Sequence, residues 1–235
     1  VVRFNHRWLQ AETIFQKVER AGLKAACINH IIFRGDVTHD LDVPRLLRLL
    51  PGVPFSEQVQ GPSMLVLGDL VRGIPQINPD DYQIAGGLLH RFGFEDAYTA
   101  RLLLTLAREG LLPDFTLAYF PDNDAASHQN GPLAAAGTLE KLDEYLGELI
   151  EIYGGLEAML AELCLVLTGD HSQSDIISNH EEAGIQVDEL LADFTVAKAG
   201  HPWQPEDDLM ACPNLRTVQI YVKDLSAFKL KKVAD

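Results

Sequence analysis

Two pairs of residues, each made of an aspartate and a histidine, stand in polar stretches of the chain. Asp124 and His128 lie four positions apart in "YFPDNDAASHQNGP", residues 119–132, and Asp170 is followed directly by His171. A carboxylate oxygen and an imidazole nitrogen together suit Zn²⁺, with Mn²⁺ as a substitute. Either pair alone is a weak signal, because aspartate is also a frequent turn residue. The position of both pairs after predicted strands makes a metal site a stronger hypothesis.

The two pairs share their position relative to predicted strands. An apolar run at 114–120 precedes the first pair, and another at 163–168 precedes the second. The carboxyl ends of parallel strands meet at one edge of a sheet, where ligands bind, so we expect the four side chains to converge there. Both pairs are expected in irregular loops, and Gly169 would let the backbone turn sharply before the adjacent Asp-His pair.

Strand-like and helix-like patterns alternate along the chain. Strands are predicted at 23–33, 114–120, 163–168 and 215–223, and helices at 11–21, 43–50, 96–110 and from 138 with a break at 153–155. This alternation favours an α/β fold with a central, mostly parallel sheet flanked by helices. Cys27 and Cys164 lie in two of the predicted strands, where we expect them as small buried residues. Residues 51–80, rich in Pro and Gly, either form an insertion or cap loop over a site or contain short strands.

The composition limits the partners of the chain. The 235 residues carry a formal net charge of −15, and 47% of them are hydrophobic, as in a globular protein. No apolar run reaches the ~18 residues of a membrane span, so no transmembrane segment is predicted. A surface this acidic repels polyanions, so nucleic acid is not expected as a partner. A small phosphate-ester or nucleotide substrate remains compatible, because divalent cations would reverse the field in a cleft.

The stretch around Asp124 closely resembles the metal-binding loop of a known family. This family is the type I phosphodiesterase/nucleotide pyrophosphatase branch of the alkaline phosphatase superfamily. Asp124, His128, Gly131 and Pro132 match the family pattern in order and spacing. "VLTGDHS", 166–172, is similar to the family's strand followed by Ser-Asp-His-Gly, with Gly in place of Ser and Ser in place of the final Gly. "IFQKVERAGLKAACINH", 14–30, also looks like a helix and strand of the family, so the resemblance covers at least residues 1–175.

The resemblance implies an alkaline-phosphatase-like α/β/α sandwich and a two-zinc hydrolase of phosphodiester or nucleotide pyrophosphate bonds. Asp124 and His128 would bind one zinc, and Asp170 and His171 the other. The nucleophilic Thr and an early Asp ligand are expected upstream of residue 1, and a late His ligand beyond the C-terminus. The resemblance also makes Asn5 a candidate for binding the phosphate.

Other readings stay open at this point. His39, in "RGDVTHDLD", could line a substrate pocket. We expect residues 1–235 to form a single catalytic domain that lacks the family's N-terminal and C-terminal parts, and that by itself binds metal weakly. The alternatives are phosphomonoester, phosphonate or sulfate-ester hydrolysis, phosphomutase chemistry, or an inactive metal-binding fragment. The natural substrate, the oligomeric state and the compartment, cytoplasmic or exported, are left open.

Overall fold

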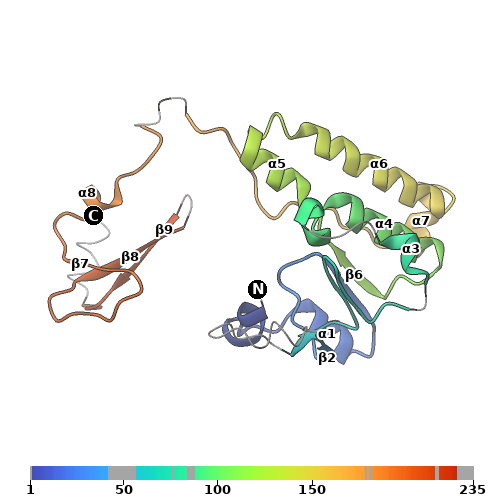
Figure 1. Cartoon of the computed structure of the whole chain (residues 1–235), viewed down its shortest axis with the longest axis horizontal. Helices are drawn as coiled ribbons and strands as arrows, with labels where there is room; N and C mark the ends of the chain where they lie inside the picture. Colours follow the sequence, from blue (N-terminus) through green and yellow to red (C-terminus); the bar gives the residue numbers. More distant parts are fainter. Residues whose placement is uncertain are drawn as a thin grey trace. The chain divides into compact units, whose positions relative to one another are not determined.

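The chain forms two compact units in the computed structural model, which describes residues 2–41, 57–75, 77–83, 88–177, 179, 182–214 and 217–226. The contacts within the chain fall into two groups, residues 1–175 and residues 176–235. The sequence predicted a single domain, and the contacts divide the chain into the two units drawn in Figure 1. We call them the first and the second unit and describe each by itself.

A four-stranded sheet forms the centre of the first unit, in the order β5-β4-β1-β6. Strand β1 (Ala25–Ile28) pairs in parallel with both β4 (Met64–Leu67) and β6 (Phe115–Ala118). The last strand, β5 (Leu70–Arg72), runs antiparallel to β4. All four residues of β1 are buried, which explains why this strand reads as a continuous apolar run. The predicted α/β fold with a mostly parallel sheet is confirmed.

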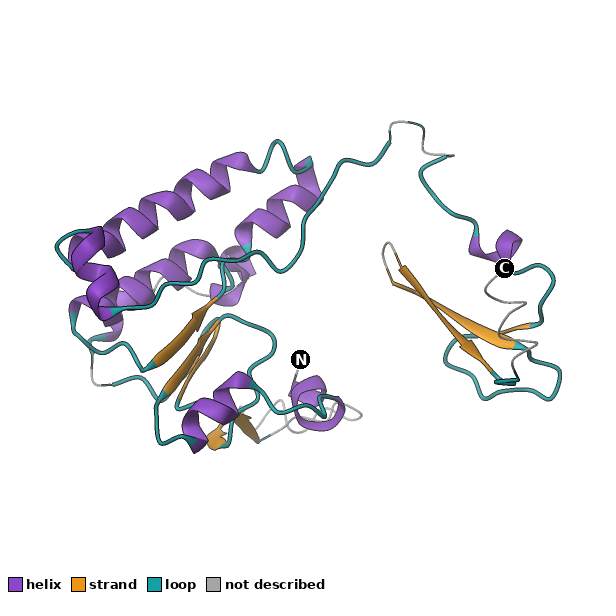
Figure 2. Ribbon diagram, turned by 180° about the vertical axis from the view of Figure 1, so that it is seen from behind, coloured by secondary structure: helices purple, strands orange, loops and turns teal. Residues whose placement is uncertain are grey.

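Helices lie along both faces of this sheet (Figure 2). Among the described residues of the first unit, the helical elements are η1 (Phe4–Trp8), α1 (Ile14–Arg20), α3 (Pro79–Tyr82), η2 (Leu88–Gly93), α4 (Asp96–Arg108), α5 (Asp122–Asn130), α6 (Ala136–Ile152) and α7 (Leu156–Glu162). The predicted helices at 11–21 and 96–110 are confirmed with shorter bounds, and the helix predicted from 138 is confirmed with an earlier start, at Ala136. Gly154 and Gly155, both with positive φ, separate α6 from α7 at the predicted break.

Alternate residues of β1 belong to two separate hydrophobic clusters. Ala26 and Ile28 pack with residues of α4 that include Leu102. Ala25 and Cys27 pack with Phe15 of α1. Since successive side chains of a strand point to opposite faces, α4 and α1 cover opposite sides of the sheet. This is the α/β/α arrangement that the resemblance implied.

Helix α6 packs on α4 as a further layer. Leu149 of α6 and Met159 of α7 are buried in one cluster with Leu104 and Ala107 of α4. The opposite side of α4 contributes Leu102 and Leu106 to the sheet-facing cluster. Helix α4 is therefore buried between the sheet and α6, which matters below because its first turn reaches the candidate site.

The Pro- and Gly-rich stretch at 51–80 contains short strands, one of the two alternatives that the sequence left open. Strand β3 (Gln58–Gly61) pairs antiparallel with β2 (Val37–Asp40). Strand β4 lies beside β1, and its Leu65 and Val66 are fully buried, so β4 belongs to the core. The predicted helix at 43–50 lies outside the described residues.

The strand predicted at 163–168 is wrong. The backbone there is extended, but none of the described strands pairs with it. Val166 and Leu167 are 77% and 69% exposed, and Cys164 is exposed rather than buried, whereas Cys27 is buried as expected. Apolar and β-branched residues favour a pleated, half-buried setting, but a strand also needs a hydrogen-bonded neighbour.

The second unit holds a small sheet in the order β7-β8-β9. A short helix, α8 (Val187–Leu190), precedes β7 (Val196–Ala197). Strand β8 (Leu209–Asn214) pairs antiparallel with β9 (Thr217–Val222), so the strand predicted at 215–223 is confirmed at a sheet edge. In neither unit does a described helix combine the length and the apolar character that a membrane crossing requires.

Candidate metal centre

The first Asp-His pair lies on helix α5, which begins directly after β6. The sequence predicted an irregular loop here, and the structure corrects this to a helix from Asp122 to Asn130. Asp122 and Asp124 stand in its first turn, where negative charge complements the helix dipole. Gly131, with φ +84°, ends the helix. The helical turn brings positions four apart together, so His128 Nε2 lies 3.5 Å from Asp124 Oδ1.

The second pair reaches the same carboxylate. His171 Nε2 lies 3.6 Å from Asp124 Oδ1 and 3.8 Å from Asp170 Oδ1. The predicted convergence of the two pairs is therefore present. The first pair follows a strand end, as expected, but the second arrives on the extended segment at 163–170 and not on a strand.

Gln173 is a neighbour of this cluster that the sequence analysis missed. Its Nε2 donates a hydrogen bond to Asp124 Oδ1 at 2.8 Å. Further along, Asp175 Oδ1 lies only 2.9 Å from the position that a Cβ on Gly131 would take. The segment from His171 to Asp175 thus runs against the last turn of α5. The only sequence signal for Gln173 is its place two residues after the second pair.

The four side chains are open to solvent and surrounded by negative charge. Those of Asp124 and His171 are 38% and 54% exposed. Burial raises the pKa of the nearby Tyr119, and the charges of Asp170, Asp124 and Asp96 raise it further. Three carboxylates thus act on one phenol at this edge of the sheet. This negative field favours the binding of a cation. The solvent exposure of the side chains gives incoming solutes access to it.

The donor set fits a transition-metal ion in residue type and in pairwise spacing. Ligand atoms about 2.0–2.1 Å from a tetrahedral Zn²⁺ lie roughly 3.3–3.4 Å from one another. The separations of Asp124 Oδ1 from His128 Nε2 and His171 Nε2, 3.5 and 3.6 Å, are close to that value. Within the described part of the chain, however, no three His, Cys, Asp or Glu side chains are already arranged to hold an ion.

Asn5, expected to bind phosphate, instead makes structural contacts. It is fully buried, its Nδ2 donates to the Ile31 carbonyl at 2.8 Å, and its Oδ1 accepts the amides of Phe33 and Arg34. Both ends of the side-chain amide are thus engaged with the backbone after β1. The structure thus gives Asn5 a role in the fold, since buried polar groups are hydrogen-bonded, and phosphate binding by Asn5 stays a prediction.

His39, expected to line a substrate pocket, is also buried. It lies in β2, 8% exposed, and its Nε2–H donates to the Pro62 carbonyl at 2.7 Å. The ring therefore ties β2 to the turn between β3 and β4. This contact explains the histidine by the fold alone.

Comparison with known proteins identifies related chains. The family described as type I phosphodiesterase / nucleotide pyrophosphatase matches residues 2–234. No solved structure matches the chain significantly. Curated relatives include 2,3-bisphosphoglycerate-independent phosphoglycerate mutases of Thermococcus gammatolerans, 28% identical over 180 residues, and Pyrococcus abyssi, 26% identical over 182 residues. Each alignment covers 76% of this chain and 39% of the relative, so the chain spans well under half the length of these relatives.

Proposed function

Since the chain belongs to the type I phosphodiesterase/nucleotide pyrophosphatase family, we propose that it carries a metal-dependent centre that hydrolyses phosphodiester or nucleotide pyrophosphate bonds. The observation that carries the proposal is the meeting of both Asp-His pairs at Asp124 Oδ1. The helical spacing of α5 places His128 beside Asp124, but it does not explain why His171, from a distant segment, faces the same oxygen. Two metal ions, one held by each pair, would explain why the pairs lie side by side.

Each pair is proposed to hold one metal ion, so that the centre contains two ions. Each ion is Zn²⁺ or Mn²⁺. Asp124 and His128 would hold the first, and Asp170 and His171 the second. When bound, two such ions polarise the phosphoryl oxygens and activate the attacking nucleophile. The nucleophile is not among the residues that the matched motifs identify.

A contact of His171 with the backbone leaves its Nε2 atom available to bind an ion. Its Nδ1 lies 3.3 Å from the Ser172 carbonyl. When Nδ1 carries the proton, it donates a hydrogen bond to that carbonyl, and the lone pair of Nε2 is directed toward the carboxylates. Gln173, which donates to Asp124 Oδ1, holds that carboxylate in its place and would yield the oxygen to an ion.

Phosphomutase chemistry is the second candidate. It is favoured by the curated relatives, whose printed names are those of phosphoglycerate mutases. A mutase returns the phosphoryl group to a second hydroxyl of the substrate, whereas a hydrolase passes it to water. Both reactions break a P–O ester bond and use the same kind of centre, so the metal ligands do not separate them.

Activity on three substrates separates these functions. The 235-residue chain, and the same residues within a chain extended at both ends, would be incubated with Zn²⁺ or Mn²⁺. Bis(p-nitrophenyl) phosphate, p-nitrophenyl phosphate and 3-phosphoglycerate would be offered in turn. We expect the extended chain to release p-nitrophenol from the diester, Asp124→Ala to abolish this release, and the 235-residue chain alone to show little of it. Interconversion of phosphoglycerates without diester cleavage would favour the mutase, and metal binding by the extended chain with no turnover of any substrate would refute both.

A further inference from the structure

The first turn of α5 receives its hydrogen-bond acceptor from another helix. The residue at its N-cap is Pro121, whose side chain cannot accept an amide hydrogen. Instead, Asp96 Oδ1, in the first turn of α4, accepts the backbone N–H of Asp122 at 2.9 Å. A side-chain acceptor at this place satisfies one of the free amides at a helix start, as an N-cap residue would.

Thr99 makes a second contact, with the backbone just before the start of α5. It lies three positions after Asp96 on α4, so both side chains are on one face of the helix. Its Oγ1 donates to the Tyr119 carbonyl at 3.1 Å. Asp96 and Thr99 therefore hold the backbone at both ends of the short link from Tyr119 to Asp122, which joins β6 to α5.

Asn29 fixes the direction of the Thr99 hydroxyl. Its Nδ2 donates to Thr99 Oγ1 at 2.9 Å, which leaves the hydroxyl hydrogen for the Tyr119 carbonyl. The same amide group donates to the Gly93 carbonyl, and Oδ1 accepts the amide of Gly68. Asn29 and Thr99 are fully buried, so this network is rigid and shielded from water.

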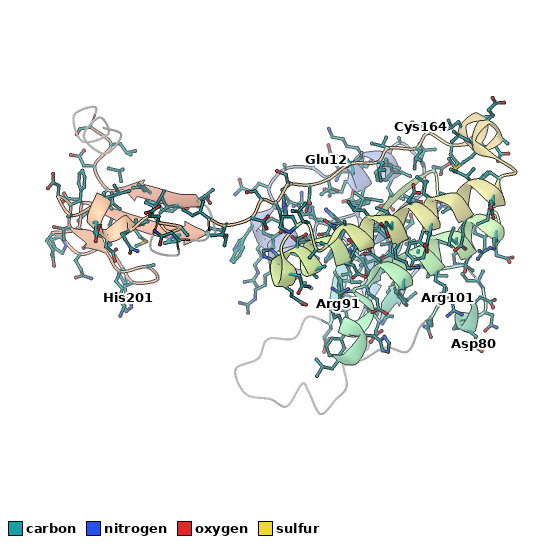
Figure 3. All side chains as sticks on the ribbon, turned by 90° about the horizontal axis from the view of Figure 1, so that it is seen from above. Glu12, Asp80, Arg91, Arg101, Cys164 and His201 are labelled. Atoms are coloured by element: carbon teal, nitrogen blue, oxygen red, sulfur yellow. The ribbon has the colours of Figure 1, made fainter. Side chains whose placement is uncertain are left out.

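A charged contact acts on the same turn from a third direction. Arg91 of η2 forms an ion pair with Asp122, and Figure 3 shows Arg91 beside α5. Asp96 itself is only 4% exposed. Burying a carboxylate this deeply costs free energy, and its hydrogen bond to the Asp122 amide compensates part of that cost.

We propose that Asp96 and Thr99 form a polar clamp that positions α5, and through it Asp124 and His128, in the candidate metal centre. Asp96 and Thr99 are positioning residues, because neither touches an ion or a substrate. The part of this inference that concerns metal rests on the proposed function. The part that concerns α5 rests on the contacts alone.

Amide hydrogen exchange, followed by NMR on the 235-residue chain, tests the clamp without reference to metal. Asp96→Ala and Thr99→Val each remove one contact, and Asp96→Asn and Thr99→Ser each retain it. We expect the amides in the first turn of α5 to exchange about tenfold faster in the first two variants, as for loss of a buried hydrogen bond. The two conservative variants should restore the exchange rates to near those of the unchanged chain.

Two variants serve as matched controls. Thr105 lies on the same helix, is buried, and donates from Oγ1 to the Asp81 carbonyl at 3.1 Å, away from α5. Asp114 accepts the Lys24 amide at 2.8 Å just before the start of β6, at the opposite end of that strand. Thr105→Val and Asp114→Ala should leave exchange in α5 within about twofold of the unchanged chain. Equal acceleration by these controls, or unchanged exchange in Asp96→Ala and Thr99→Val, would overturn the clamp.

Titration with zinc chloride gives the second readout. We expect Asp96→Ala and Thr99→Val to weaken zinc binding about tenfold, and Asp96→Asn and Thr99→Ser to restore it. If the unchanged chain bound no zinc, the proposed function would fail while the exchange data still decided the clamp. If zinc bound equally to all variants although α5 amides exchanged faster, the clamp would not position the metal ligands and the proposal would be wrong.

Discussion

Asp124 Oδ1 lies 3.6 Å from His171 Nε2, although the two residues belong to elements far apart in the chain. The same oxygen lies 3.5 Å from His128 Nε2, one helical turn away. A single carboxylate thus links a pair that is local in sequence to one that is not. The predictions that follow depend on this junction and on the elements that build it.

The two histidines should contribute to different ions. His128→Ala should weaken one zinc site by about tenfold or more and affect the other less, because His128 is assigned to the ion held with Asp124. His171→Ala should show the reverse. Isothermal titration with zinc resolves the two sites, and His90→Ala serves as the control, since His90 pairs with Glu95 outside the cluster. Equal loss of both sites in either variant would contradict the assignment.

Gly131→Ala should destabilise the first unit. The residue has φ +84°, and an added Cβ would lie 2.9 Å from Asp175 Oδ1. We expect a loss of about 1–2 kcal/mol in the free energy of unfolding, measured with urea, because both the backbone and the neighbour are strained.

Gly147→Ala is the matched control for that variant. Gly147 lies within α6, and a Cβ there would meet nothing within 4 Å. Alanine should therefore stabilise this helix by about 0.5–1 kcal/mol. If Gly131→Ala did not lower the free energy of unfolding relative to Gly147→Ala, the segment from His171 to Asp175 would not lie against the end of α5.

Asp96 should make stability depend on pH. Burial raises its pKa to about 6, and the charge of Arg91 lowers it in part. The charge of Arg91 acts on Asp96, and the charge of Asp96 adds to the effect of burial in raising the pKa of Tyr119 and of Tyr145. The backbone amide of Asp122 donates to the Asp96 carboxylate. The folded pKa exceeds the unfolded one, so the folded state holds the proton more tightly and Asp96 lowers stability as pH rises from about 4 to 6.

Asp96→Asn should remove this pH dependence. The variant keeps an oxygen that can accept the Asp122 amide but carries no charge to bury. We expect it to gain about 1–2 kcal/mol relative to the unchanged chain at pH 7, and much less at pH 4, in urea unfolding. Asp114→Asn, which changes an exposed carboxylate, is the control. A gain at pH 4 as large as at pH 7 would show that Asp96 does not titrate in this window.

The exposed cysteine should react far faster than the buried one. Cys27 is buried in β1, and burial raises the pKa of its thiol to about 12. Cys164 is exposed on the extended segment after α7. Ellman's reagent at pH 8 should label Cys164 within minutes and Cys27 only after unfolding, because the thiolate is the reactive species. Assignment of the labels by peptide mass spectrometry checks this, and rapid labelling of Cys27 would contradict the buried position of β1.

Local sequence patterns predicted several main elements of the first unit. The continuous apolar run at 23–33 predicted a buried strand, and β1 is that strand with both faces covered. The periodicity of 96–110 predicted α4, which is buried on two sides. The four-residue spacing of Asp124 and His128 already matched the helical period, but the low helix propensity of the stretch hid α5. Its N-terminal start depends on Asp96, which no local pattern of residues 119–132 includes.

Contacts between distant segments explain what the sequence missed. The strand at 163–168 was predicted from composition, yet pairing depends on a neighbour that composition does not reveal. Asn5 was a candidate through the family resemblance and His39 through the polar stretch around it, and their burial against backbone carbonyls and amides follows only from the fold. Gln173 and Asp96 act on the candidate site through single hydrogen bonds across large sequence separations. Such contacts leave no periodic signal.

Anomalous diffraction at the zinc edge, on crystals of the chain soaked in zinc chloride, tests the central claim most directly. The account predicts a peak within about 2.0–2.2 Å of a carboxylate oxygen of Asp124 and of at least one imidazole nitrogen of His128 or His171. The same soak of Asp124→Ala crystals should lack that peak. Zinc bound only at other residues, or no zinc at an ordered cluster of these side chains, would contradict the proposed metal centre.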